Sequence, residues 1–133
     1  MAAENSSEWW SFADADLDTA QLLRKMRPRH YEIICYHCEQ AAEKYLKGYL
    51  IARNVRPPKT HELDELCALC SEKDKSFDEL AGICGFLTQF GVQPRYPYEM
   101  DITEKNVEHA VKYAERVKNF TPIVAVREEN LNK

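Results

Sequence analysis

The chain has 133 residues, of which 44% are hydrophobic and 30% carry a charge, and its formal net charge at pH 7 is −4. This length and composition fit one globular domain, and they exclude a disordered chain and a membrane-embedded one. The negative balance also argues against strong sequence-independent binding to duplex DNA, which requires a basic surface.

The first predicted helix runs from about Glu8 to Met26 and follows a capping pattern formed by Asn5 and Glu8. Its apolar positions recur at helical spacing, at Trp9, Phe12, Ala13, Leu17, Ala20 and Leu23. Asp16 lies in the middle of this apolar arc. A buried carboxylate without a partner is costly, so we expect Asp16 to form a structural ion pair with a base of the second helix or of the loop around Arg95. The alternative is that Asp16 lies at the wet edge of the arc.

The second predicted helix follows Pro28, continues to about Asn54, and cannot extend through the two prolines that come next. Its dry face consists of Ile34, Cys38, Ala41, Ala42, Tyr45 and Tyr49. The opposite face carries a polar stripe of His37, Gln40, Lys44 and Lys47. This polar stripe is either a binding site for an anion or a solvated face on which the lysines pair at most with neighbouring glutamates.

Two shorter helices are predicted next. Thr60 is placed to cap a helix over about residues 61–72. Ser76 and Glu79 have the spacing of a capping box for a helix over about residues 77–90.

The last predicted helix starts at Asp101 or Thr103, after a loop rich in glycine and proline, and ends near Asn119. The tail, residues 121–133, contains a short apolar run at residues 123–126 that indicates no particular element. The sequence therefore predicts an all-α, up-and-down bundle of four to five helices. It forms a single domain over residues 1–133, with its core at about residues 8–120.

Five cysteines form two CxxC pairs, Cys35 with Cys38 and Cys67 with Cys70, and leave Cys84 alone. The gap between the pairs is too long for a zinc ribbon, so we expect small buried hydrophobic residues and neither a metal nor a cofactor. The odd count fits a reducing compartment.

The acidic N-terminus does not resemble a signal peptide and no apolar run approaches the length of a membrane span, so we expect a cytoplasmic protein that does not enter a membrane.

Short motifs follow one another along residues 8–118 in a distinctive order. They are Trp9 or Trp10, Ala13-x-x-Asp16-Leu17-x-x-Ala20, His37-x-x-Gln40-Ala41-x-Glu43-Lys44-x-Leu46-Lys47, Lys59-Thr60-His61-Glu62-Leu63 and Arg95-Tyr96-Pro97. Together they make the chain resemble the HEPN domain, named for a nucleotide-binding domain of higher eukaryotes and prokaryotes. The resemblance implies a helical bundle, often a homodimer, that works with a nucleotidyltransferase protein and binds a nucleotide or RNA. The implied site residues are His37, Gln40, Lys44, Lys47, Arg95 and Tyr96.

Many members of this family are metal-independent ribonucleases, in which an Arg is followed by a polar residue and, shortly after, by a His. Arg95 is followed by no His before His109, and Arg56 and His61 have a suitable spacing but lie in a loop with two prolines. The chain therefore resembles the non-nuclease branch, without catalytic residues. Two alternatives to a binding module remain: an RNase toxin of a toxin–antitoxin pair that uses Arg56 and His61, and a purely structural dimerisation domain.

Overall fold

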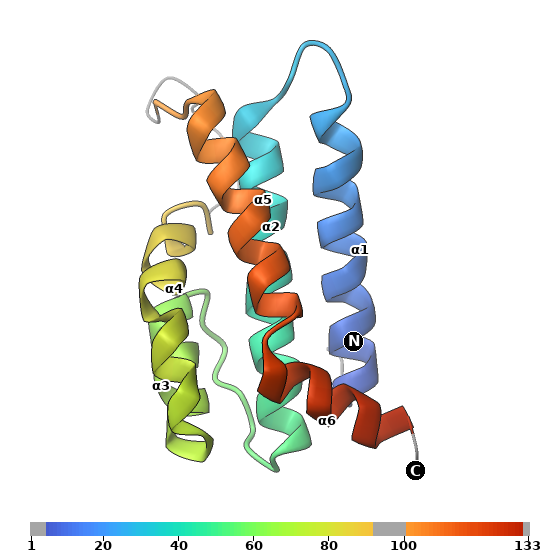
Figure 1. The fold of residues 1–133 in the computed structure, drawn as a ribbon, viewed down its shortest axis with the longest axis vertical. Helices are drawn as coiled ribbons and strands as arrows, with labels where there is room; N and C mark the ends of the chain where they lie inside the picture. Colours follow the sequence, from blue (N-terminus) through green and yellow to red (C-terminus); the bar gives the residue numbers. More distant parts are fainter. Residues whose placement is uncertain (1–4, 92–100, 132–133) are drawn as a thin grey trace.

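The computed structural model describes residues 5–91 and 101–131, and every regular element within them is a helix. The elements are α1 (Ser6–Arg24), α2 (Tyr31–Ala52), α3 (Leu63–Lys73), the 3-10 helix η1 (Lys75–Leu80), α4 (Ala81–Thr88), α5 (Glu104–Lys118) and α6 (Thr121–Leu131). Figure 1 shows α1, α2 and α5 as long neighbouring columns, with α3 and α4 forming a further column and α6 crossing one end. The predicted all-α bundle is confirmed.

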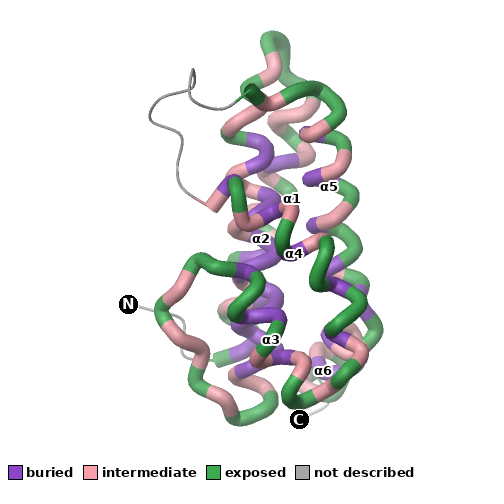
Figure 2. Tube along the Cα trace, turned by 90° about the vertical axis from the view of Figure 1, so that its left-hand side faces the viewer, coloured by how far each residue is buried: buried purple, intermediate pink, exposed green. Residues whose placement is uncertain are grey.

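The central helix of the bundle is α2, which packs against each of the other five α-helices. The six apolar positions predicted for its dry face are all buried. Burial extends well beyond that face, because Glu39, Glu43 and Lys47 are buried as well. In Figure 2 most of the α2 tube is accordingly drawn as buried. Only a narrow strip of this helix reaches solvent, and that strip positions the candidate site described below.

The first helix begins two residues earlier than predicted, at Ser6, and Asn5 caps it by accepting a hydrogen bond from the backbone N–H of Glu8 at 2.9 Å. Its buried row contains Trp10, whereas Phe12 is 55% exposed, so the predicted placement of Phe12 in the core was wrong. Trp10 can lie close to α2 because it meets Gly48. A Cβ atom on that glycine would lie 2.4 Å from the indole Nε1 of Trp10.

The starts of the shorter helices differ from the capping patterns expected. The Thr60 hydroxyl accepts a hydrogen bond from the N–H of Glu62 at 3.1 Å, and α3 begins only at Leu63. The cap before η1 is Asp74, whose carboxylate accepts from the N–H of Ser76 at 3.0 Å, so the predicted capping box of Ser76 and Glu79 was wrong. An aspartate at this position competes well for the first free N–H groups of a helical turn. The start of α5 follows the prediction, because Thr103 forms a capping box with Asn106.

The ambiguous tail forms the helix α6, so the prediction that the helical core ends near residue 120 was too short. Its apolar residues Ile123 and Val126 lie one turn apart and are both buried. The guanidinium of Arg127 forms two hydrogen bonds with the carboxylate of Asp14, at 3.2 and 2.9 Å, and lies 5.6 Å from the ring centre of Trp10. The β-branched residues of this run gave no helical signal, and packing against α1 and α2 decides the outcome.

The five cysteines are free thiols in the core, which confirms their reading as small buried residues. Burial raises the pKa of the Cys35 thiol to about 12, so this thiol is protonated and unreactive at neutral pH. Among the described residues no group of three or more His, Cys, Asp or Glu side chains is placed to hold a metal ion. In the same part of the chain no helix has both the length and the apolar character that crossing a bilayer requires.

Candidate functional site

A sheltered ionic cluster lies where α1 meets α2. The carboxylate of Asp16, with 13% of its side chain exposed, accepts a hydrogen bond from the ammonium of Lys44 at 2.5 Å. Its other oxygen lies 2.9 Å from Nδ1 of His37. The partner of Asp16 therefore comes from the second helix, one of the two sources that the sequence analysis named. Sheltering a carboxylate from water without such a partner would be costly.

A second ionic cluster follows one turn further along α2. The carboxylate of Glu43 lies 3.0 Å from the ammonium of Lys47 and, through its other oxygen, 3.0 Å from Nδ1 of His61. Glu43 and Lys47 are buried, whereas the side chain of His61 is 71% exposed. The ammonium of Lys47 also lies 5.5 Å from the ring centre of Trp9, within the range of a cation–π interaction.

One turn before Glu43 on α2 lies Glu39, which is fully buried although it is a carboxylic acid. Its Oε1 accepts a hydrogen bond from the side-chain amide of Gln40 at 2.8 Å, and its Oε2 has no hydrogen-bond partner within the described residues. Burial, followed by the neighbouring charge of Glu43, raises the pKa of Glu39 to about 8. The Glu39 carboxyl is therefore mostly protonated and uncharged at pH 7.

The predicted polar stripe exists as one row on α2, but it is not a solvated helix face. Lys44 keeps 24% of its side chain exposed and Lys47 only 8%, and each ammonium is already bonded to a carboxylate. His37 and Gln40, which precede both lysines in the row, are half-buried. The remaining predicted site residues, Arg95 and Tyr96, lie outside the described residues, so their expected convergence with Lys44 stays a prediction.

The predicted site residues did not include four members of this region: Trp9, Glu39, Glu43 and His61. Glu39 and Glu43 lie one turn apart, and Glu43 is four residues before Lys47, which is the spacing of an ion pair along a helix. That signal was available. It was assigned to the surface because the helix was treated as having one dry face, whereas α2 is surrounded on most sides by other helices.

The two residues of the alternative nuclease reading are placed differently from each other. Arg56 is exposed and forms no side-chain hydrogen bond or ion pair within the described residues, whereas one ring nitrogen of His61 is engaged by Glu43. His61 precedes the first residue of α3 by two positions, rather than lying inside the helix as predicted. This arrangement ties His61 to the second ionic cluster.

The fold places this chain among small proteins that consist of a helical bundle. The sequence model of the HEPN domain matches residues 6–124, and the chain therefore belongs to the HEPN domain family.

Two solved structures resemble this fold. The crystal structure of TT1696 from Thermus thermophilus gives a TM-score of 0.75 at 24% identity, covering 95% of this chain and 98% of that one. The crystal structure of ST0689, an archaeal HEPN homologue, gives a TM-score of 0.69 at 21% identity, covering 96% of this chain and 98% of that one. No protein of curated function matches the sequence.

Proposed function

We propose that this chain is a non-catalytic, cytoplasmic HEPN module that binds the phosphate of a nucleotide or of RNA at the face formed by α1 and α2. The observation that carries the proposal is the sheltered cluster of Asp16, His37 and Lys44. Packed apolar side chains of similar volume are often as stable as a buried ion pair, or more stable, so stability gives little reason for charge at this seam. A ligand that uses the lysine gives such a reason.

The proposed binding step is an exchange of partners at Lys44. In the free protein the ammonium donates to Asp16, and with the ligand bound it turns toward a phosphate oxygen while His37 keeps hold of the carboxylate. The side-chain amide of Gln40 carries a second N–H that can donate to the same phosphate. Arg95 and Tyr96 belong to the proposal as a bidentate phosphate ligand and a stacking surface for a base.

A binding titration with mononucleotides and a short single-stranded RNA tests this function. We expect Lys44→Ala and Arg95→Ala each to weaken binding about tenfold, and added salt to weaken it further. Lys112→Ala, at an exposed position of α5, is the charge-matched control and should bind as the wild type does. Equal binding by wild type and Lys44→Ala, or no binding at millimolar ligand, would refute the proposal.

The ribonuclease alternative is tested on the same RNA. A binding module leaves the RNA intact, whereas a nuclease that depends on His61 cleaves it in the wild type and loses cleavage in His61→Ala. A purely structural dimerisation domain predicts that neither nucleotide nor RNA changes the thermal stability of the protein.

The proposal includes a homodimer that works with a nucleotidyltransferase protein. It is supported by large apolar side chains on the outside of the bundle, Phe12, Leu22 and Met26 of the α1 region and Ile33 of α2, each at least 40% exposed. Light scattering at tens of micromolar should give the mass of two chains. A strictly monomeric mass would contradict the homodimer, and absence of co-purification with a co-expressed nucleotidyltransferase would contradict the partnership.

A further inference from the structure

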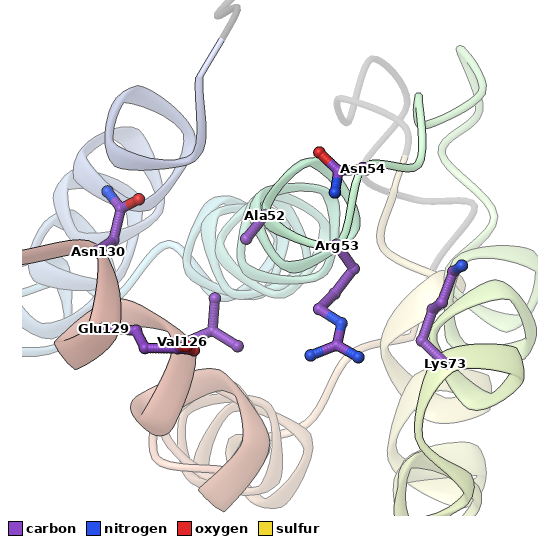
Figure 3. A pocket seen from close by; sticks show the side chains of 7 residues that line it. All are labelled: Ala52, Arg53, Asn54, Lys73, Val126, Glu129 and Asn130. Carbon is purple, nitrogen blue, oxygen red and sulfur yellow. The ribbon is translucent and has the colours of Figure 1, made fainter. Parts of the chain in front are cut away.

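A polar hollow lies at the end of the bundle where α2 and α3 finish. It has a volume of about 260 Å³ and is lined by Ala52, Arg53, Asn54, Lys73, Val126, Glu129 and Asn130. Figure 3 shows Arg53 reaching from the end of α2 into the space between α6 and α3, with Lys73 on the far side of it. None of these residues belongs to the ionic clusters of the candidate site.

The cations of this pocket differ from the sheltered cations of the bundle. Arg24, Arg29, Lys44, Lys47 and Arg127 each form an ion pair with a carboxylate. Within the described residues, the side chains of Arg53 and Lys73 form neither an ion pair nor a hydrogen bond. The pocket therefore holds two positive charges that are not neutralised by direct contact.

Two nearby carboxylates, Asp74 and Glu129, form no ion pair with these cations, but the charge of Arg53, after the hydrogen bonds from Ser76, helps to lower the pKa of Asp74. Asp74, which follows α3 directly, is occupied as the cap of η1, since both the N–H and the hydroxyl of Ser76 donate to it. Glu129 lines the pocket but forms no ion pair with Arg53 or Lys73. The amide group of Asn130 donates one hydrogen bond to the hydroxyl of Ser7 and keeps a second N–H.

From these observations we propose that the pocket binds a phosphoryl group, with Arg53 as a bidentate ligand and Lys73 as a second charge. An arginine fork matches two phosphate oxygens and a lysine adds a point charge. The volume lies just below the usual range for small-molecule pockets, about 300–1,000 Å³, and leaves ample room for a phosphoryl group. The group is supplied either by free phosphate or by a mononucleotide whose base remains outside.

A ligand in this pocket should stabilise the docking of α6. The ligand would join the ends of α2 and α3 to α6, which otherwise reaches this region through Val126, Glu129 and Asn130. Binding should therefore slow hydrogen exchange of the α6 amides, because a ligand that prefers the docked helix opposes its local opening.

The test is a titration of the full chain with inorganic phosphate and, separately, with a mononucleotide, followed by thermal stability and by exchange of the α6 amides. Arg53→Gln and Lys73→Gln should each weaken phosphate binding about tenfold. Their matched controls, Arg56→Gln and Lys75→Gln, remove one exposed charge from neighbouring positions and should leave it unchanged.

A variant that is expected to bind phosphate more tightly keeps the test informative even if the variants that lose binding misfold. Glu129→Gln removes the carboxylate that lines the pocket and should tighten phosphate binding a few-fold, while Glu128→Gln, its exposed neighbour, should have no effect. Measured in the Lys44→Ala background, which removes the α1–α2 site, tighter binding of the mononucleotide than of phosphate would identify a nucleotide as the source, and equal or weaker binding would identify free phosphate. No stabilisation by phosphate, or equal losses in the variants and their controls, would overturn the proposal. Lys44→Ala should not alter phosphate binding here, which separates this pocket from the proposed function.

Discussion

Replacing the buried acid of α2 with its neutral isostere, Glu39→Gln, should change how the stability of the protein depends on pH. Glu39 is fully buried, and its pKa is raised to about 8 from an ordinary value of 4.5, first by burial and then by the charge of Glu43. Between these two values the folded protein holds a proton that the unfolded chain releases. The free energy of unfolding therefore falls as the pH rises through this interval.

The magnitude follows from the width of the interval. Each pH unit between the two pKa values removes about 1.4 kcal/mol from the free energy of unfolding. The loss is absent below pH 4.5, well advanced at pH 7 and complete above about pH 8, where it amounts to several kcal/mol. Since glutamine carries no charge to desolvate, Glu39→Gln should match the wild type near pH 4.5 and exceed it by several kcal/mol above pH 8.

Urea unfolding followed by circular dichroism at a series of pH values measures this difference. The exposed Glu128→Gln is the matched control, and its stability should run parallel to that of the wild type across the range. Subtracting the wild-type curve removes every pH-dependent contribution that the two proteins share. Parallel curves for Glu39→Gln and wild type would refute the reasoning, because they would mean that Glu39 ionises as easily in the folded protein as in the unfolded chain.

Three substitutions test the packing and the ion pairs. Gly48→Ala should lower the urea midpoint, because the new Cβ would lie 2.4 Å from the indole of Trp10 and overpacking costs about 1–3 kcal/mol, more than the roughly 1 kcal/mol gained in helix propensity. Lys44→Met should cost about 1–3 kcal/mol because it leaves Asp16 sheltered without its cation, and adding Asp16→Asn should restore most of the loss in the same assay. Arg127→Met should cost about 1 kcal/mol, because its ion pair is partly exposed, and should speed hydrogen exchange in α6; unchanged exchange would contradict the role of that pair.

Local patterns in the sequence predict the helices well where one residue settles a boundary. The cap at Asn5 was predicted from its partner Glu8, three residues on, and Thr103 was one of the two starts predicted for the last helix. The sequence could not predict that Trp10, rather than Phe12, lies in the core. The choice depends on how α1 is rotated about its axis, and only the neighbouring helix fixes that rotation. Gly48 fixes it here by leaving room for the larger indole.

The sequence could predict which residues of α2 form one polar row, but not how deeply each of them is buried. The spacing of His37, Gln40, Lys44 and Lys47 places them in one row whatever surrounds the helix. How far Lys47 is buried depends on elements from elsewhere in the chain, including Trp9. The spacing of residues along one helix carries no information on the side chains that pack against it from other elements. The sequence therefore indicated which charged residues align, but not which of them are exposed to solvent.

The contact between Arg127 and Asp14 joins residues 113 positions apart, whereas α1 and α2 are joined by a short turn. Closing so long a loop loses more chain entropy than forming the α1–α2 hairpin, so we expect α6 to dock late in folding, onto a surface that the hairpin has already built. Substitutions in α6 should then act mainly on the unfolding rate and those at the α1–α2 seam on the folding rate, a division that stopped-flow kinetics can measure. The two ends of the described chain would meet last and separate first.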